Sequence, residues 1–143
     1  MDASEAVARE EIRDVISRYN HAGDRGDLDA LVHCFTEDGV LDLADEDDFV
    51  GRAAILARLS GVVAASVERG PRALVRHHVS SVKIALTGSE TARAASYFLV
   101  FTEVGLDHWG RYADRFARTH GAWRIAHRKV RLDGASPVSR MAK

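Results

Sequence analysis

The sequence contains a single cysteine, Cys34, so no disulfide can form within the chain. Cys34 lies among apolar neighbours in LVHCF, where a free cysteine is a small buried hydrophobe rather than a nucleophile. No apolar run approaches the ~20 residues that cross a bilayer, so we predict no membrane span. The first residues are acidic and lack an apolar segment, so we expect no signal peptide and a cytoplasmic protein.

Several chemistries lack the motifs they need. The 7 histidines form no HExxH and no Cys/His ligand spacing, so we predict no metal site. There is no GxGxxG, GxxxxGK[ST] or GxSxG, so nucleotide binding and serine hydrolysis have no support. With 20 basic and 21 acidic side chains, the formal net charge is −1, and the arginines are scattered. We therefore expect no cofactor and no nucleic-acid partner.

The first half of the chain has the periodicity of helices. The 143 residues suit one domain with a single core. Apolar residues at i, i+3, i+4 and i+7 predict a helix over residues 4–22. Asp27 is placed to cap a short helix over residues 27–35, and a third helix is expected over residues 51–68, ended by GPR (70–72).

From residue 74 the apolar period changes from 3.6 to 2, which is the period of a β-strand. A turn at TEDG (36–39) and a brief strand at residues 40–43 precede this region. Short, turn-prone connectors separate the later strands, so we expect an antiparallel meander. Its four strands are predicted at residues 74–86, 91–103, 108–119 and 122–132.

Helices followed by consecutive strands indicate an α+β fold, with a pocket between the helices and the sheet. Both faces of residues 91–103 are rather apolar. Since helices can cover only one of them, we expect the other face to meet a partner subunit in a dimer or trimer. Residues 135–143 are expected to form a flexible tail.

The segment RHHVSS, residues 76–81, places two adjacent histidines on one predicted strand, where neighbours point to opposite faces. The apolar face changes parity near Ser80 and Ser81, which is what a β-bulge produces. With a bulge there, His77 faces the pocket and His78 faces away. His77 is then either a core histidine satisfied by one hydrogen bond or a group that does chemistry.

Asp24 is a candidate partner for His77, because it lies in the loop that closes the first helix. A carboxylate bonded to one imidazole nitrogen fixes the tautomer and stabilises the imidazolium form. Such a pair is a general base suited to neutral pH. Asp24 could instead be a loop cap, and the helical spacing alone does not bring it to His77.

The whole chain, from IRDVISRYN through RHHVSS to GAWRIAHRKV, resembles the nuclear transport factor two-like superfamily. It is most similar to SnoaL-like domains of the scytalone dehydratase and lindane dehydrochlorinase type. The resemblance implies a cone-shaped barrel, in which a strongly bent antiparallel sheet carries three helices from the N-terminal half on its concave face. It also implies a dyad of Asp24, in GDRGDLDAL, and His77.

Five further residues are candidates for contacting a substrate. Tyr19 can donate a phenolic hydrogen bond, or it is a plain core tyrosine. His108 is the nearest equivalent of the second histidine of the dehydratases. Tyr112 and Asp114 share its strand face, and Arg128 either holds an oxyanion or leaving group or pairs with Asp114 across the hairpin.

These residues lead to two hypotheses of different classes. The first is a cofactor-independent lyase or isomerase, in which His77 removes a proton from carbon of a small apolar molecule such as a polyketide, steroid or terpenoid. Dehydration, dehydrohalogenation and double-bond isomerisation all begin with this step. The second is a non-catalytic ligand-binding or assembly domain, related to the β subunit of aromatic-ring dioxygenases.

Overall fold

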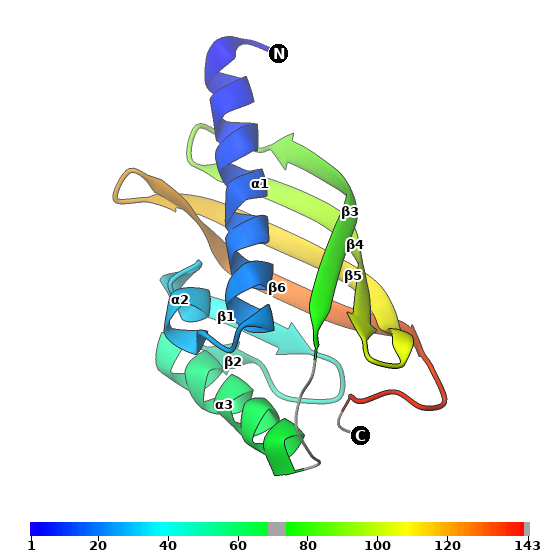
Figure 1. The fold of residues 1–143 in the computed structure, drawn as a ribbon. Coiled ribbons are helices and arrows are strands. Elements are labelled where there is room, and N and C mark those ends of the chain that lie inside the picture. The colour runs from blue at the N-terminus through cyan, green and yellow to red at the C-terminus, as the bar shows by residue number, and fades with distance from the viewer. Residues whose placement is uncertain (69–73, 142–143) are drawn as a thin grey trace.

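The computed structural model describes residues 1–68 and 74–141. Within these residues, three helices pack on one side of a six-stranded sheet, an α+β arrangement (Figure 1). In chain order the elements are α1 (Ala3–Asp24), α2 (Leu28–Val32), β1 (Phe35–Leu43), β2 (Phe49–Val50), α3 (Arg52–Glu68), β3 (Arg76–Leu86), β4 (Thr91–Thr102), β5 (Gly105–Thr119) and β6 (Ala122–Ala135).

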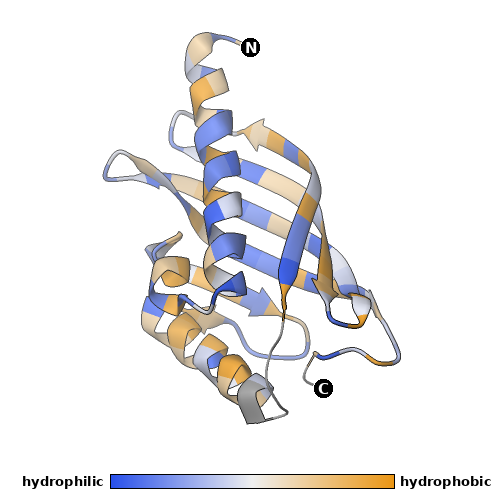
Figure 2. Cartoon of the chain, viewed as in Figure 1, coloured by the Kyte–Doolittle hydropathy of each residue, from blue (hydrophilic) through white to orange (hydrophobic). Residues whose placement is uncertain are grey.

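Helix α1 runs across the sheet and packs against β3 and β6. It begins where the side chain of Asp2 accepts a hydrogen bond from the backbone N–H of Glu5. The predicted apolar stripe is buried, with Ile12, Val15 and Ile16 among the least exposed residues of the core. The opposite face of the helix is hydrophilic (Figure 2), so the stripe determines which side of α1 contacts the sheet.

Of the other two helices, α2 is shorter than predicted and α3 agrees closely with the prediction. Asp27 caps α2 by accepting the N–H of Ala30, but α2 ends at Val32 and β1 already begins at Phe35. Helix α3 begins one residue later than expected and ends at Glu68. The helix-ending segment proposed at residues 70–72 lies outside the described residues.

The sheet order is β2-β1-β6-β5-β4-β3. The predicted antiparallel meander of β3 to β6 is confirmed. The expectation of a wholly antiparallel sheet is wrong, because β1 lies beside β6 and runs parallel to it. Helix α2 directly precedes β1 in the chain, and β1 then runs in the same direction as β6. Residues 36–39, expected to form a turn, belong to β1 as an irregular stretch between two paired regions.

Among the described residues, β2 and β3 are the two edges of this sheet, and their pairing into a closed barrel is not seen. Hydrophilic and hydrophobic residues alternate along β4 and β5 (Figure 2), and the inner set forms the core together with the helices. No helix in the described part of the chain is long and apolar enough to cross a membrane.

The predicted bulge in β3 is confirmed. The register of β3 against β4 shifts between Ser80 and Lys83, and Ser81 has a left-handed φ of 53°. His77 is half-buried and His78 is exposed, so the parity change assigned the two histidines to their correct faces. The inner face of β3 is continuous across the bulge and consists of His77, Val79, Val82, Ile84 and Leu86, with Val75 directly before the strand.

Candidate active site

The carboxylate of Asp24 contacts His77 twice. Asp24 is the last residue of α1, and His77 is the second residue of β3. The ring Nδ1 of His77 lies 2.5 Å from Oδ1 of Asp24, and the backbone N–H of His77 donates to Oδ2 at 3.0 Å. Because a carboxylate only accepts hydrogen bonds, Nδ1 carries the ring proton and Nε2 has a free lone pair in the neutral ring. The described residues supply no hydrogen-bond partner for Nε2.

His77 lies on the wall of two adjoining cavities. The core cavity, about 340 Å³, lies between the helices and the inner face of the sheet. The tail cavity, about 440 Å³, lies between α3, the β4–β5 hairpin and the C-terminal tail. His77, His108, Val62 and Met141 line both of them. Apolar side chains form most of the core cavity: Leu28, Leu31, Leu41, Leu43, Leu59, Val62, Val63, Phe98, Val130 and Leu132.

A second aspartate–histidine pair borders the cavities: His108 lines both of them, and Asp107 lines the tail cavity. The ring Nδ1 of His108 lies 2.7 Å from Oδ1 of Asp107, the preceding residue. The β4–β5 register brings His108 opposite Val100 and Leu106 opposite Phe101, so Asp107 is the extra residue of a bulge. This bulge turns two consecutive side chains inward, which a regular strand cannot do.

Asp107 is fully buried. Burial opposes ionisation of its carboxyl, but hydrogen bonds from the backbone of Arg140 and from the side chains of Ser139, His108 and Thr102 outweigh burial. Together they hold the pKa of Asp107 well below its usual value. The carboxylate therefore accepts from Nδ1 of His108, and Nε2 is the nitrogen left for the cavity. The sequence placed Asp107 in a connector and gave no sign of this pair.

Two tyrosines border the core cavity, one from a helix and one from the sheet. Tyr19 of α1 and Tyr112 of β5 meet edge to face, and Tyr112 stacks on Phe98 with ring centroids 4.7 Å apart. Burial raises the pKa of both phenols above the usual value, although the charge of Arg128 opposes the rise. Both hydroxyl groups therefore stay protonated at neutral pH and can donate hydrogen bonds.

Arg128 lies against both tyrosine rings, with Cζ 4.3 Å from the centroid of Tyr19 and 3.8 Å from that of Tyr112. It is fully buried and forms two hydrogen bonds with Asp114, at 2.9 and 2.8 Å. Burial would lower the pKa of the guanidinium, but the Asp114 carboxylate outweighs burial and raises it. Among the described residues, Nη1 of Arg128 has no hydrogen-bond partner.

The structure therefore divides the predicted residues into two layers. Four line the core cavity, namely Tyr19, His77, His108 and Tyr112. The other three lie behind them: Asp24 contacts His77, and the pair of Asp114 and Arg128 supports the tyrosines. The cross-hairpin ion pair, one of the two interpretations of Arg128, is confirmed.

One group of potential metal ligands occurs in the described part of the chain. Ligand atoms of Asp42, Asp48 and His127 lie within 4.8 Å of one another. Asp42 already accepts a hydrogen bond from Arg131 at 3.0 Å, and the guanidinium charge opposes a cation there. These three residues do not border either cavity, so they have no place in the site.

Comparison with known proteins identifies the family of this chain. The model of the SnoaL-like domain matches residues 4–129. An NTF2-like protein with a cystatin-like fold from Novosphingobium aromaticivorans is 30% identical, with a TM-score of 0.76 over 97% of this chain and 95% of that one.

Two more distant structures share the fold. A candidate scytalone dehydratase from Novosphingobium aromaticivorans is 20% identical, with a TM-score of 0.79 over 99% of this chain and 100% of that one. LinA is 14% identical, with a TM-score of 0.80 over 98% and 97%. No functionally curated protein matches the sequence. The extent of the family match shows that this chain belongs to the SnoaL-like domain family of the nuclear transport factor two-like superfamily.

Proposed function

We propose that the protein is a cofactor-independent lyase or isomerase that acts on a small, largely apolar molecule in the core cavity. The observation that carries this proposal is the contact between Asp24 and His77, which leaves Nε2 of the imidazole at the wall of an apolar cavity without a partner among the described residues. The substrate class is that of polyketide-, steroid- or terpenoid-like compounds. A cavity of about 340 Å³ between helices and sheet, where a cone-shaped barrel would enclose its ligand, suits such a molecule.

The chemical step begins with a C–H bond of the substrate. Nε2 of His77 takes the proton, and the electron pair of that bond moves into the substrate. Asp24 stabilises the imidazolium that forms and keeps the ring in place. In an elimination the electron pair forms a C=C bond while a hydroxyl or halide leaves. In an isomerisation an enolate forms, and the proton returns to another carbon.

Negative charge develops on the leaving group or the enolate oxygen during this step. Tyr19 and Tyr112 supply neutral phenolic donors at the cavity wall, and the guanidinium of Arg128 lies against both rings. His108 is the second group that can give or take a proton, because Asp107 binds its Nδ1. Most of the side chains that line this cavity are apolar, so each electrostatic contact is stronger than it would be in solution.

The fold supports this proposal without selecting a reaction. It is shared with a candidate scytalone dehydratase and with LinA. The alternative is a non-catalytic ligand-binding or assembly domain. Its structural role would be favoured by a filled cavity, or by a His77 with both ring nitrogens bonded to protein groups. Neither feature is present among the described residues.

The decisive experiment compares His77→Ala with His78→Ala. The two residues are adjacent, but His78 is exposed and packs on Phe101 outside the cavities. Wild type and both variants are tested for hydrogen–deuterium exchange at carbon, and for elimination, on cyclic ketones, hydroxyketones and haloalkanes. We expect wild type and His78→Ala to be active and His77→Ala to lose at least about 100-fold. Equal activity in the two variants would end the dyad hypothesis. No activity in wild type together with ligand-induced thermal stabilisation would support the binding module instead.

A further inference from the structure

Asp107 receives more hydrogen bonds than any other carboxylate in the two cavities, and half of them come from the C-terminal tail. Oδ1 accepts from the hydroxyl of Ser139, and Oδ2 accepts the backbone N–H of Arg140 at 2.7 Å. The remaining two donors are His108 and Thr102, both from the β4–β5 region. The tail expected to be flexible is therefore bonded to a buried carboxylate through Ser139 and Arg140.

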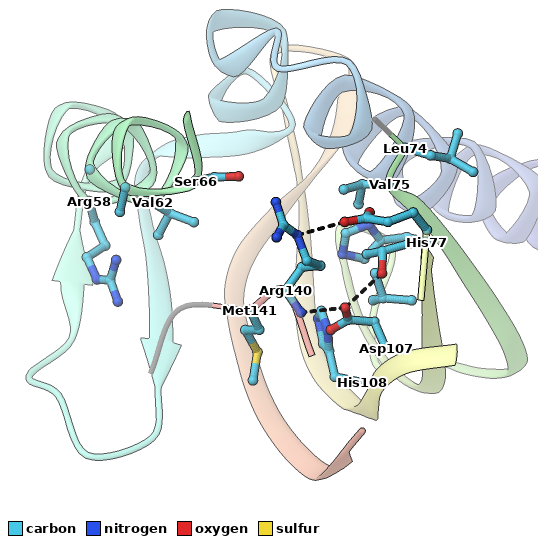
Figure 3. A pocket seen from close by; sticks show the side chains of 15 residues that line it. Arg58, Val62, Ser66, Leu74, Val75, His77, Asp107, His108, Arg140 and Met141 are labelled. Carbon is cyan, nitrogen blue, oxygen red and sulfur yellow. Dashed lines mark hydrogen bonds and ion pairs between the residues drawn. The ribbon is translucent and has the colours of Figure 1, made fainter. Parts of the chain in front are cut away.

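The same tail residues form part of the cavity walls. Met141 borders both cavities, and the guanidinium of Arg140 pairs with Glu103 at 2.7 Å. In Figure 3, Arg140 and Met141 lie between side chains of α3, such as Val62, and the inner residues of the strands, such as His108. The segment closes one side of the site and simultaneously binds Asp107.

We propose that Asp107 is a positioning residue for His108, and that Ser139, Arg140 and Met141, here called the C-terminal strap, hold it in place. The effect on catalysis rests on the proposed function. The effect on the histidine ring does not, because it depends only on the hydrogen bonds of the carboxylate.

The argument follows from the donors of a buried carboxylate. Two oxygens offer about four lone-pair sites, and here all of them have a donor. If the strap leaves, a fully buried charge loses two of its four hydrogen bonds, which is costly. Asp107 must then turn toward water, and it gives up its geometry toward His108. Docking of the strap and orientation of His108 are therefore coupled, because both depend on the same carboxylate.

A ligand in either cavity shifts this equilibrium. It touches Met141 only when the strap is docked, so it binds the docked state more tightly. By linkage, the factor by which the ligand raises the equilibrium constant for strap docking equals the factor by which docking raises ligand affinity. Loss of docking therefore lowers the affinity for the ligand by that factor. The strap would thus couple the closure of the cavity to the alignment of the second histidine.

The test removes the two donors of the strap and keeps the rest of the chain. Ser139→Ala deletes the hydroxyl, and Arg140→Pro deletes the backbone N–H; the two are combined. Arg140→Ala is the matched control, because it keeps the N–H and loses only the ion pair with Glu103. Ser136→Ala is a second control, since its hydroxyl caps Val138 and does not reach the Asp107 carboxylate.

The first measurement is the ¹⁵N chemical shifts of His108 in protein labelled at histidine, which report the ring tautomer. We expect one tautomer, protonated at Nδ1, in wild type and both controls, and a mixture of both tautomers in the Ser139→Ala/Arg140→Pro variant. Asp107→Asn should give the same mixture if it folds. An unchanged tautomer in the folded double variant would overturn the proposal, whatever the activity of the protein.

The second measurement is activity with any substrate that the His77→Ala comparison identifies. In metal sites, loss of a group that orients a histidine ligand costs about 10–100-fold in activity. We expect a loss of similar size for the double variant, because it releases the carboxylate that orients His108. A changed tautomer with no substrate found would refute the proposed function and retain the strap. A changed tautomer with undiminished turnover would refute the positioning role of Asp107 in the reaction.

Discussion

Asp24 binds one residue, His77, at both its backbone N–H and its ring. The two contacts have different consequences. The bond to the backbone fixes the start of β3 against the end of α1, and the bond to Nδ1 fixes the ring relative to that backbone. A single carboxylate therefore positions the proposed base in space and also sets its tautomer.

Asp24→Asn should separate these two functions. The amide can still accept one hydrogen bond, but its NH₂ group competes with the Nδ1 proton, which favours the other tautomer and leaves Nε2 protonated. We expect activity to fall about 10²–10⁴-fold while the melting temperature changes little, since the change is isosteric. Turnover and thermal unfolding are measured on the same preparation. An active Asp24→Asn protein would show that the aspartate only anchors β3.

Features of the site that depend on one strand can be predicted from the sequence, whereas contacts between distant segments cannot. The parity change in RHHVSS is a pattern within one strand, so it could locate the bulge and the inward histidine without the fold. The pairing of β1 with β6 joins segments about ninety residues apart in the chain, and no local pattern specifies it. Asp24 is likewise only a candidate partner of His77 from its place in the chain, and the family resemblance is what pairs the two residues.

The pair of Asp107 and His108 was missed for a related reason. Period-2 reasoning assigns neighbours to opposite faces, and Asp107 ends the turn-prone connector VGLD, so the sequence pattern does not predict an inward side chain there. The bulge that brings both side chains inward is specified by contacts with β4 and with the tail. A short Asp–His sequence beside a turn is therefore worth testing as a bulged pair in related chains.

The bulge itself predicts the effect of changes at Ser81. Its φ of 53° lies in the left-handed region, which β-branched residues tolerate poorly. Ser81→Val should lower the free energy of unfolding by about 1–2 kcal/mol, whereas Ser81→Gly should not lower it. Ser80→Val is the matched control, because Ser80 has no left-handed φ. Urea unfolding checks the series, and equal stability of the two valine variants would contradict it.

The buried ion pair beneath the tyrosines predicts a non-additive result. Arg128→Met leaves Asp114 charged and unpaired in the interior, which should cost about 3–5 kcal/mol of unfolding free energy. Arg128→Met combined with Asp114→Leu removes both charges, and we expect it to be more stable than Arg128→Met alone. A double-mutant cycle by urea unfolding gives the coupling. If Arg128→Met is as stable as wild type, the pair does not hold the tyrosines in place.

We propose that the outer face of the sheet joins two or three copies of the chain. Tyr97, Leu99 and Phe101 of β4 lie exposed there, with 59% of Tyr97 accessible, while the helices cover the other face. Tyr97→Glu with Leu99→Glu should therefore convert a dimer or trimer to monomer, as measured by light scattering after size exclusion. Val7→Glu, on an exposed position of α1, should keep the oligomer. A monomeric wild type would refute the proposal.

The low pKa of Asp107 predicts how acid affects the fold. Burial acts against its carboxylate, but the surrounding hydrogen bonds outweigh it, so the pKa in the folded protein lies below the usual 3.8. Between those two values the unfolded chain binds a proton that the folded chain does not. The stabilisation by Asp107 is therefore fully present above about pH 5 and is lost as the pH falls below 4.

Asp107→Asn removes this proton linkage and should flatten the dependence. The free energy of unfolding in urea is compared at pH 5.5 and pH 3.5, and wild type should lose more stability between the two values than Asp107→Asn does. Asp47→Asn, in an exposed loop, is the control against which the change is measured. Equal losses in wild type and Asp107→Asn would mean that the hydrogen bonds from Ser139 and Arg140 do not persist in solution. The strap would then not be docked on the carboxylate, so this measurement of stability also tests the proposed positioning of His108.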